Sequence, residues 1–187
     1  CLINYIDKSP KKFYSQEAFD KYFYSLEYIK QTDPKILADI LTNAEPLLSI
    51  SNKIIAEIND KPIHDIFVPK DHNDLINFID KEIHYNLLKL YETPFYQLSH
   101  VLAKYYWIKN KKGIDGLDLY NTVEELKKHD FEFIVPYYLH DVRNGIAHGK
   151  IIFSDFDITY IDKKGNKAKI STKKIIETFD SILDITN

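Results

Sequence analysis

The chain has 187 residues, of which 44% are hydrophobic and 28% charged, and its formal net charge is −3. This composition predicts one globular domain, or a domain with an appendage, and the acidic balance disfavours a dedicated duplex-DNA binder. The single cysteine, Cys1, excludes a disulfide within the chain and favours a reducing cytoplasm. No apolar run approaches the roughly 20 residues that span a bilayer, so we expect no membrane association. The chain lacks Met altogether, and we expect it to be a piece of a larger protein.

Hydrophobic residues at helical spacing predict helices through the first third of the chain. The first should cover about 15–31, with a serine as its N-cap. Asp33-Pro34 is a typical start signal for the second, over 33–58, because Asp caps well and Pro suits the first helical position. Pro46 should kink or divide this second helix. Residues 59–72 are expected to form a connection.

The middle of the chain predicts three further helices. One should cover 73–91, and Thr93-Pro94 should start a new helix that ends at Gly113. A short helix is expected over 121–128, with Asn121 as the first residue of a capping box.

The periodicity changes towards the C-terminus. A helix that begins at 131 or 136 should end at Ala147, with Gly149 as a left-handed cap. Strand-like and turn-like segments follow, and Thr172 should cap a final helix to about 185. The predicted fold class is therefore all-α in the main, a helical bundle with a small C-terminal β-hairpin formed by 151–153, 157–161 and 167–170.

Within the helix that ends at Ala147, polar and apolar residues separate onto two faces. His140, Asn144 and His148 step by about 40° each and share one face, with Arg143 about 60° from His140. The opposite stripe is apolar and should face the core, and it consists of Val135, Leu139, Val142 and Ile146.

These polar residue types suit phosphodiester chemistry. Arg143 is the only arginine beside 24 lysines, and its planar, permanently charged fork matches phosphate oxygens as lysine cannot. Histidine exchanges protons near neutral pH. RNA cleavage through its own 2′-OH needs a base for that proton and stabilisation of the charged phosphorane, and requires no metal in principle.

The run Arg143-Asn144-x-x-x-His148, followed by Gly149, resembles the Arg-x4–6-His motif of the HEPN superfamily. The resemblance covers residues 137–149 firmly and about 94–185 more broadly. It implies a HEPN-like bundle over 73–187, preceded by an N-terminal helical extension over 1–72, both within one continuous domain.

That resemblance also implies a function: metal-independent cleavage of RNA, as a toxin or antiviral-defence effector. Arg143 would stabilise the phosphorane, His148 would handle protons and Asn144 would position them. The expected products carry 2′,3′-cyclic phosphates, and no cofactor or metal is expected. HEPN ribonucleases pair two motifs across a dimer cleft, so we expect a homodimer through this face, with an antitoxin or further domains of a larger chain as other partners.

Simpler interpretations exist for each residue. Arg143 could form a surface salt bridge, and His148 could cap the helix C-terminus. Some HEPN domains have lost cleavage, so a non-catalytic module that binds RNA or nucleotide, or a dimerisation unit, is the alternative function. Candidate substrate-binding residues are His140, Lys150, Lys163 and Lys164. The other histidines show no metal-ligand spacing, which disfavours a zinc site.

Overall fold

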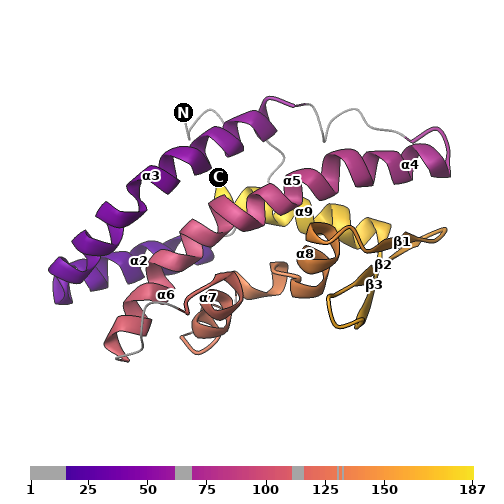
Figure 1. The fold of residues 1–187 in the computed structure, drawn as a ribbon. Helices are drawn as coiled ribbons and strands as arrows, with labels where there is room; N and C mark the ends of the chain where they lie inside the picture. The colour runs from indigo at the N-terminus through magenta and orange to yellow at the C-terminus, as the bar shows by residue number, and fades with distance from the viewer. Residues whose placement is uncertain (1–15, 62–68, 111–115, 130, 132) are drawn as a thin grey trace.

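The computed structural model describes residues 16–61, 69–110, 116–129, 131 and 133–187. It confirms a mainly helical fold with a small antiparallel sheet (Figure 1). The helices outside the central long helix are α2 (Gln16–Thr32), α3 (Pro34–Asn59), α7 (Leu119–Leu126), the 3₁₀ segment η3 (Val135–Tyr137), α8 (His140–Ala147) and α9 (Thr172–Thr186). The predicted cap at Ser15 and stop at Gly113 lie outside the described residues.

One uninterrupted helical rod runs from His72 to Lys109 through the middle of the molecule (Figure 1). Its successive parts are α4 (His72–Phe78), the π-helical segment η1 (Ile79–His84), α5 (Tyr85–Leu90), the π-helical segment η2 (Tyr91–Phe95) and α6 (Tyr96–Lys109). The predicted break at Thr93-Pro94 is therefore wrong. Pro94 lies inside η2, where the wider i→i+5 turn accommodates a residue that lacks an N–H and would crowd the carbonyl of a regular α-turn.

The predicted start of α3 is confirmed, and its predicted division is not. Asp33 is the N-cap and Pro34 the first helical residue, but α3 continues without interruption past Pro46. The Asp33 carboxylate does not cap its own helix. It accepts hydrogen bonds from the Tyr105 hydroxyl at 2.8 Å and from Lys109 Nζ at 3.1 Å, which hold the pKa of Asp33 below its usual value. The start of α3 is thereby tied to the end of α6.

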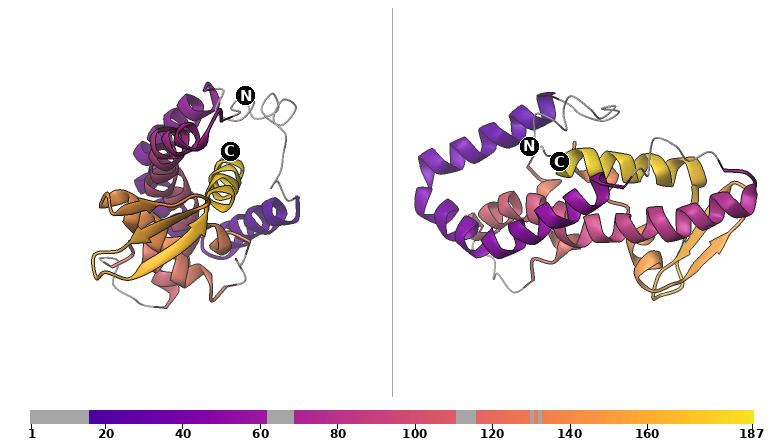
Figure 2. Two further views of the ribbon diagram at one scale, coloured as in Figure 1. Left: turned by 90° about the vertical axis from the view of Figure 1, so that its right-hand side faces the viewer. Right: turned by 90° about the horizontal axis from the view of Figure 1, so that it is seen from above.

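The buried side chains form two clusters along the long helix. One joins α5, η2, α8, α9 and the sheet, and includes Leu87, Leu90, Phe95, Val142, Ile158 and Phe179. The other joins α2, α3, α6 and α7, and includes Ile29, Leu37, Ile40, Leu102 and Leu126. The two clusters adjoin each other, since Tyr22 and Phe133 pack against both. The turn between α2 and α3 lies at one end of the molecule and the sheet at the other (Figure 2). The expected division of the chain into an N-terminal extension over 1–72 and a bundle over 73–187 stays a prediction.

The sheet has three strands, which correspond to the three segments predicted for the C-terminal hairpin. They are β1 (Ile151–Phe153), β2 (Asp157–Ile161) and β3 (Lys167–Ser171), antiparallel in the order β1-β2-β3. All three segments matched the predicted strands, and the turn between β2 and β3 is confirmed by Gly165 at φ 87°. The final helix is capped one residue earlier than predicted, because the Ser171 hydroxyl accepts the Lys174 N–H. In the described parts of the chain, no helix is both long and apolar enough to cross a membrane.

Candidate functional site

The helix that carries the polar residues is shorter than the sequence indicates. Here α8 (His140–Ala147) begins only after η3, so the predicted start at 131 or 136 is wrong, whereas the predicted end at Ala147 is confirmed. The cause is a buried tyrosine of η2. The Tyr91 hydroxyl donates to the Tyr137 carbonyl at 2.6 Å and accepts the Leu139 N–H at 3.2 Å. These bonds replace helical ones and hold the two residues before α8 in an extended conformation.

A close approach of helix to strand fixes α8 on the sheet. Val142 is fully buried and Ile146 packs against the same cluster, as the apolar stripe predicts. Gly145 faces β2 so closely that a Cβ at this position would lie 2.6 Å from Tyr160 Cβ. Tyr160 is itself fixed, because its hydroxyl lies 2.7 Å from the buried Nε2 of His84 in η1.

The α7 helix has Asp118 as its N-cap, so the predicted cap at Asn121 is wrong.

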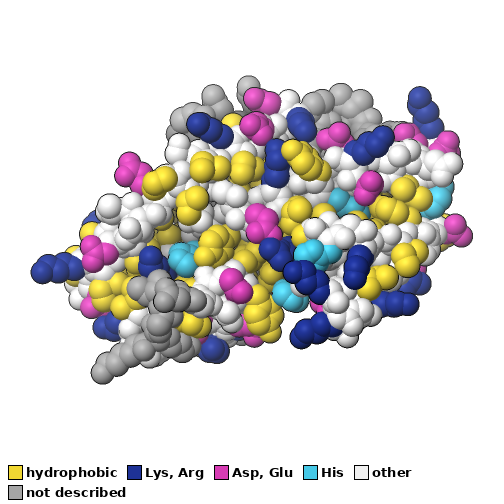
Figure 3. Space-filling view, viewed as in Figure 1, with side chains coloured by type: hydrophobic (Ala, Val, Ile, Leu, Met, Phe, Trp, Pro, Cys, Tyr) yellow, Lys and Arg dark blue, Asp and Glu magenta, His cyan; other side chains and the backbone are white. Residues whose placement is uncertain are grey.

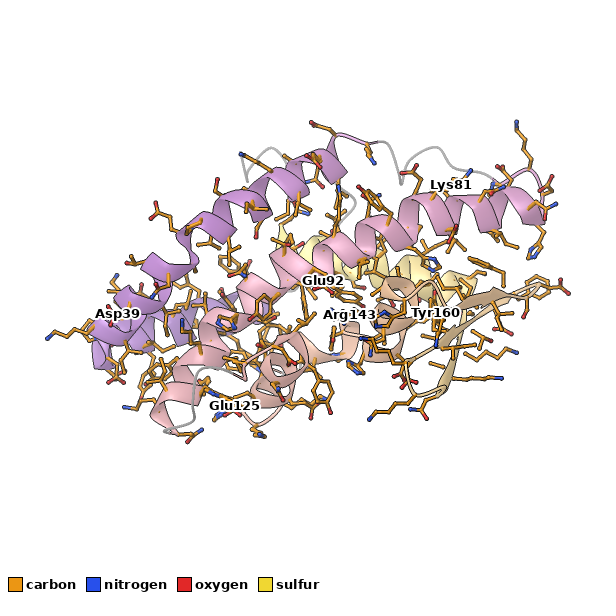
Figure 4. The ribbon with its side chains drawn as sticks, in the orientation of Figure 1. Asp39, Lys81, Glu92, Glu125, Arg143 and Tyr160 are labelled. Atoms are coloured by element: carbon orange, nitrogen blue, oxygen red, sulfur yellow. The ribbon has the colours of Figure 1, made fainter. Side chains whose placement is uncertain are left out.

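Arg143 is held by an acidic residue that the sequence analysis did not identify. Its Nε lies 2.6 Å and its Nη2 2.5 Å from Oε1 of Glu92, which projects from η2. Figure 4 shows the two side chains next to each other beneath the long helix. Nη1 donates to Oδ1 of the adjacent Asn144 at 2.9 Å. The Arg143 side chain is 29% exposed, so the guanidinium is oriented from two sides and still reaches solvent.

The same network extends through Asn144 to His140. Because Oδ1 of Asn144 accepts from Arg143, its Nδ2 must face Nε2 of His140, 3.0 Å away. An amide NH₂ group only donates, so Nε2 accepts and carries no proton, and the neutral ring is protonated at Nδ1. Nδ1 lies 3.3 Å from the Tyr138 hydroxyl, whose oxygen can accept a hydrogen bond from the Nδ1–H group. Burial raises the pKa of Tyr138, so its hydroxyl stays neutral. Tyr120 completes the surroundings, with its ring centroid 4.8 Å from that of His140.

His148 stands apart from this network. It is the exposed C-cap of α8, and its N–H donates to the Asn144 carbonyl. Its side chain makes no hydrogen bond or ion pair within the described part of the chain. On a regular helix it lies about 140° around the axis and about 7.5 Å along it from Arg143. Within one copy of the protein, hydrogen bonds therefore connect Arg143 through Asn144 to His140, and they do not reach His148.

The candidate lysines gather at one end of the sheet. Lys150 directly precedes β1, and its carbonyl accepts the Ile161 N–H at 2.9 Å, so it lies opposite the end of β2. Lys163 and Lys164 follow in the exposed β2–β3 turn. On the face shown in Figure 3, basic side chains and histidines lie next to one another to the right of centre. This arrangement puts several positive charges near the C-terminal end of α8.

The described residues contain no group of three or more His, Cys, Asp or Glu side chains that could hold a metal ion. One histidine of the sequence, His64, lies outside the described residues and is not covered by this statement. Comparison with known proteins found no matching family model, no matching curated protein and no matching solved structure.

Proposed function

We propose that this chain is a metal-independent endoribonuclease of the HEPN type, acting as a toxin or antiviral-defence effector. The observation that carries the proposal is the setting of Arg143. The only arginine of the chain is partly exposed and donates to Asn144, and the NH₂ group of that same Asn144 faces Nε2 of His140. An oriented cation beside a neutral imidazole is what 2′-OH attack on a phosphodiester needs.

The ion pair with Glu92 bears on how a phosphate would bind. One carboxylate oxygen takes two of the guanidinium N–H groups in the free chain. A phosphate is a similar acceptor, and Arg–phosphate pairs are commonly bidentate. RNA would displace Glu92 and take over the same donors. Because Glu92 is 42% exposed, its carboxylate is readily hydrated once displaced, so the exchange costs little.

We also propose a homodimer through the exposed face of α8, with RNA bound between the copies. In one chain His148 lies on a different side of α8 from Arg143, and a second copy would supply a His148 to that phosphate. Lys150, Lys163 and Lys164, at the neighbouring end of the sheet, would contact the RNA backbone. A cytoplasmic location and an antitoxin or additional domains as partners belong to the same proposal.

A second candidate function is a non-catalytic HEPN module that binds RNA or nucleotide or serves for dimerisation. The ion pair itself favours it, because Glu92 already neutralises Arg143 and the pair also fastens α8 to the long helix. Binding of RNA without turnover at any pH from 5 to 9 would identify this function.

Cleavage assays in EDTA separate these functions. The wild type should cleave single-stranded RNA, and Arg143→Ala and His148→Ala should lose about 100-fold or more of the rate. Arg143→Lys keeps the charge without the fork and should also be impaired. His72→Ala, at an exposed histidine of α4, is the matched control and should cleave normally. Loss of wild-type activity in EDTA, or full activity of both alanine variants, would contradict the mechanism.

A further inference from the structure

We propose that His140 is the general base of this site and removes the 2′-OH proton from RNA. The inference rests on the proposed ribonuclease function and assigns a catalytic role to a residue outside the Arg-x4–6-His pattern. It is argued from the hydrogen bonds that connect His140 to Arg143.

The first argument is position. His140 and Arg143 are three residues apart on α8, a spacing that puts side chains on neighbouring parts of one helix face, about 5–6 Å apart at Cβ. Asn144 touches both of them, at 2.9 Å from Arg143 Nη1 and at 3.0 Å from His140 Nε2. A phosphate on the guanidinium therefore brings its ribose within reach of His140. His148 lies about 12 Å along the helix from His140, so the two histidines of one chain cannot serve one phosphate.

The second argument is the protonation state, which the network imposes through geometry. Arg143 can only donate, so it fixes the carbonyl side of Asn144 towards itself and the NH₂ side towards His140. His140 must then keep its Nε2 lone pair free of a proton, which is the form a general base requires. The Tyr138 hydroxyl on Nδ1 and the Tyr120 ring against the imidazole hold the ring in place. Both tyrosines are positioning residues in this scheme.

The chemical step is balanced within this arrangement. The 2′-OH replaces the Asn144 NH₂ group at Nε2 and transfers its proton there, and O2′ forms a bond to phosphorus. The P–O5′ bond breaks, and the leaving 5′-oxygen takes a proton from the His148 that the proposed second copy supplies, which then regains a proton from solvent. The products are a 2′,3′-cyclic phosphate and a 5′-OH end, and His140 afterwards releases its proton to solvent.

Chemical rescue tests the assignment. Single-turnover cleavage of RNA in EDTA by His140→Ala should be at least about 100-fold slower than by the wild type. Added imidazole should restore part of that rate, and it should leave Arg143→Ala inactive. His72→Ala should show neither effect, and thermal melts should establish that each variant is folded. His140→Gln preserves a polar side chain that cannot take the proton, so it should be as slow as His140→Ala.

The outcomes distinguish the two proposals. If the wild type cleaves no RNA, the proposed function fails and this inference with it. If the wild type cleaves and folded His140→Ala cleaves within about threefold of its rate, only the role of His140 is refuted. A slow, folded His140→Ala that imidazole does not accelerate also overturns the role, because it marks His140 as a structural residue.

Discussion

Replacement of Gly145 by alanine tests how tightly the helix that carries Arg143 is held against the sheet. The new methyl group would lie 2.6 Å from Tyr160 Cβ, 2.9 Å from its Cδ1 and 3.2 Å from its Cα. Ordinary contact begins at 3.4 Å, so α8 and β2 must separate by about 0.8 Å. Tyr160 cannot turn aside, because it is fully buried and its hydroxyl lies 2.7 Å from His84 Nε2.

The expected cost follows from two opposing effects. Overpacking of a core typically costs about 1–3 kcal/mol, and the upper end applies because the clash involves Cβ and backbone atoms, not the end of a flexible side chain. Alanine in place of glycine inside a helix returns about 1 kcal/mol. The net destabilisation of Gly145→Ala is therefore about 2 kcal/mol, which lowers the Tm of a chain of this size by about 4–8 °C.

The assay is thermal unfolding followed by circular dichroism. Gly116→Ala is the matched control, since no atom lies within 4 Å of the corresponding Cβ, and it should change stability by less than about 0.5 kcal/mol. A Gly145→Ala variant that melts at or above the temperature of the wild type would refute the close approach of α8 to β2.

Three further predictions concern residues around the site. Tyr91→Phe removes the hydroxyl that binds the Leu139 N–H, and should destabilise the protein by about 1–2 kcal/mol in urea unfolding, with no loss if the bridge is absent. Burial lowers the pKa of His84 to about 4, against 6.5 for an ordinary histidine, so the unfolded state binds more protons between these values. The free energy of unfolding should therefore fall as the pH drops from 6.5 to 4, by up to about 1.4 kcal/mol per pH unit from this residue. Urea unfolding of His84→Gln at several pH values should show a weaker dependence of that free energy on pH. Glu92→Gln weakens the competitor for Arg143 and should tighten binding of a non-cleavable RNA in filter assays, with less than about 1 kcal/mol change in stability; weaker binding would contradict the displacement of Glu92.

The sequence predicts most of the helices because their signals are local. Asp33-Pro34 starts α3 as expected, and Gly149 adopts φ 62° as the left-handed cap after α8. The errors occur where tertiary contacts overrule these signals. A proline at position 94 normally ends a helix, but here a π-helical turn carries the helix through it. The hydroxyl of Tyr91 likewise interrupts the helix expected before His140.

The candidate site was predicted only in part, for the same reason. Arg143 and Asn144 are adjacent in the chain, and their contact with His140 follows from helical spacing. Glu92 lies 51 residues away and gives no local signal, so only the packing of η2 against α8 reveals it. A π-helical turn is a common mark of functional positions, but the irregular register that produces it is not visible in hydrophobic periodicity.

The central claim is that Arg143 and its neighbouring side chains cleave RNA through the substrate's own 2′-OH. The most direct measurement compares, in EDTA, an RNA oligonucleotide with the same sequence carrying one 2′-deoxy nucleotide at the mapped cleavage position. We expect the RNA to be cut with 2′,3′-cyclic phosphate and 5′-OH ends, and the substituted strand to stay intact at that position. Cleavage of the substituted strand there, or products with 5′-phosphate ends, would contradict the account.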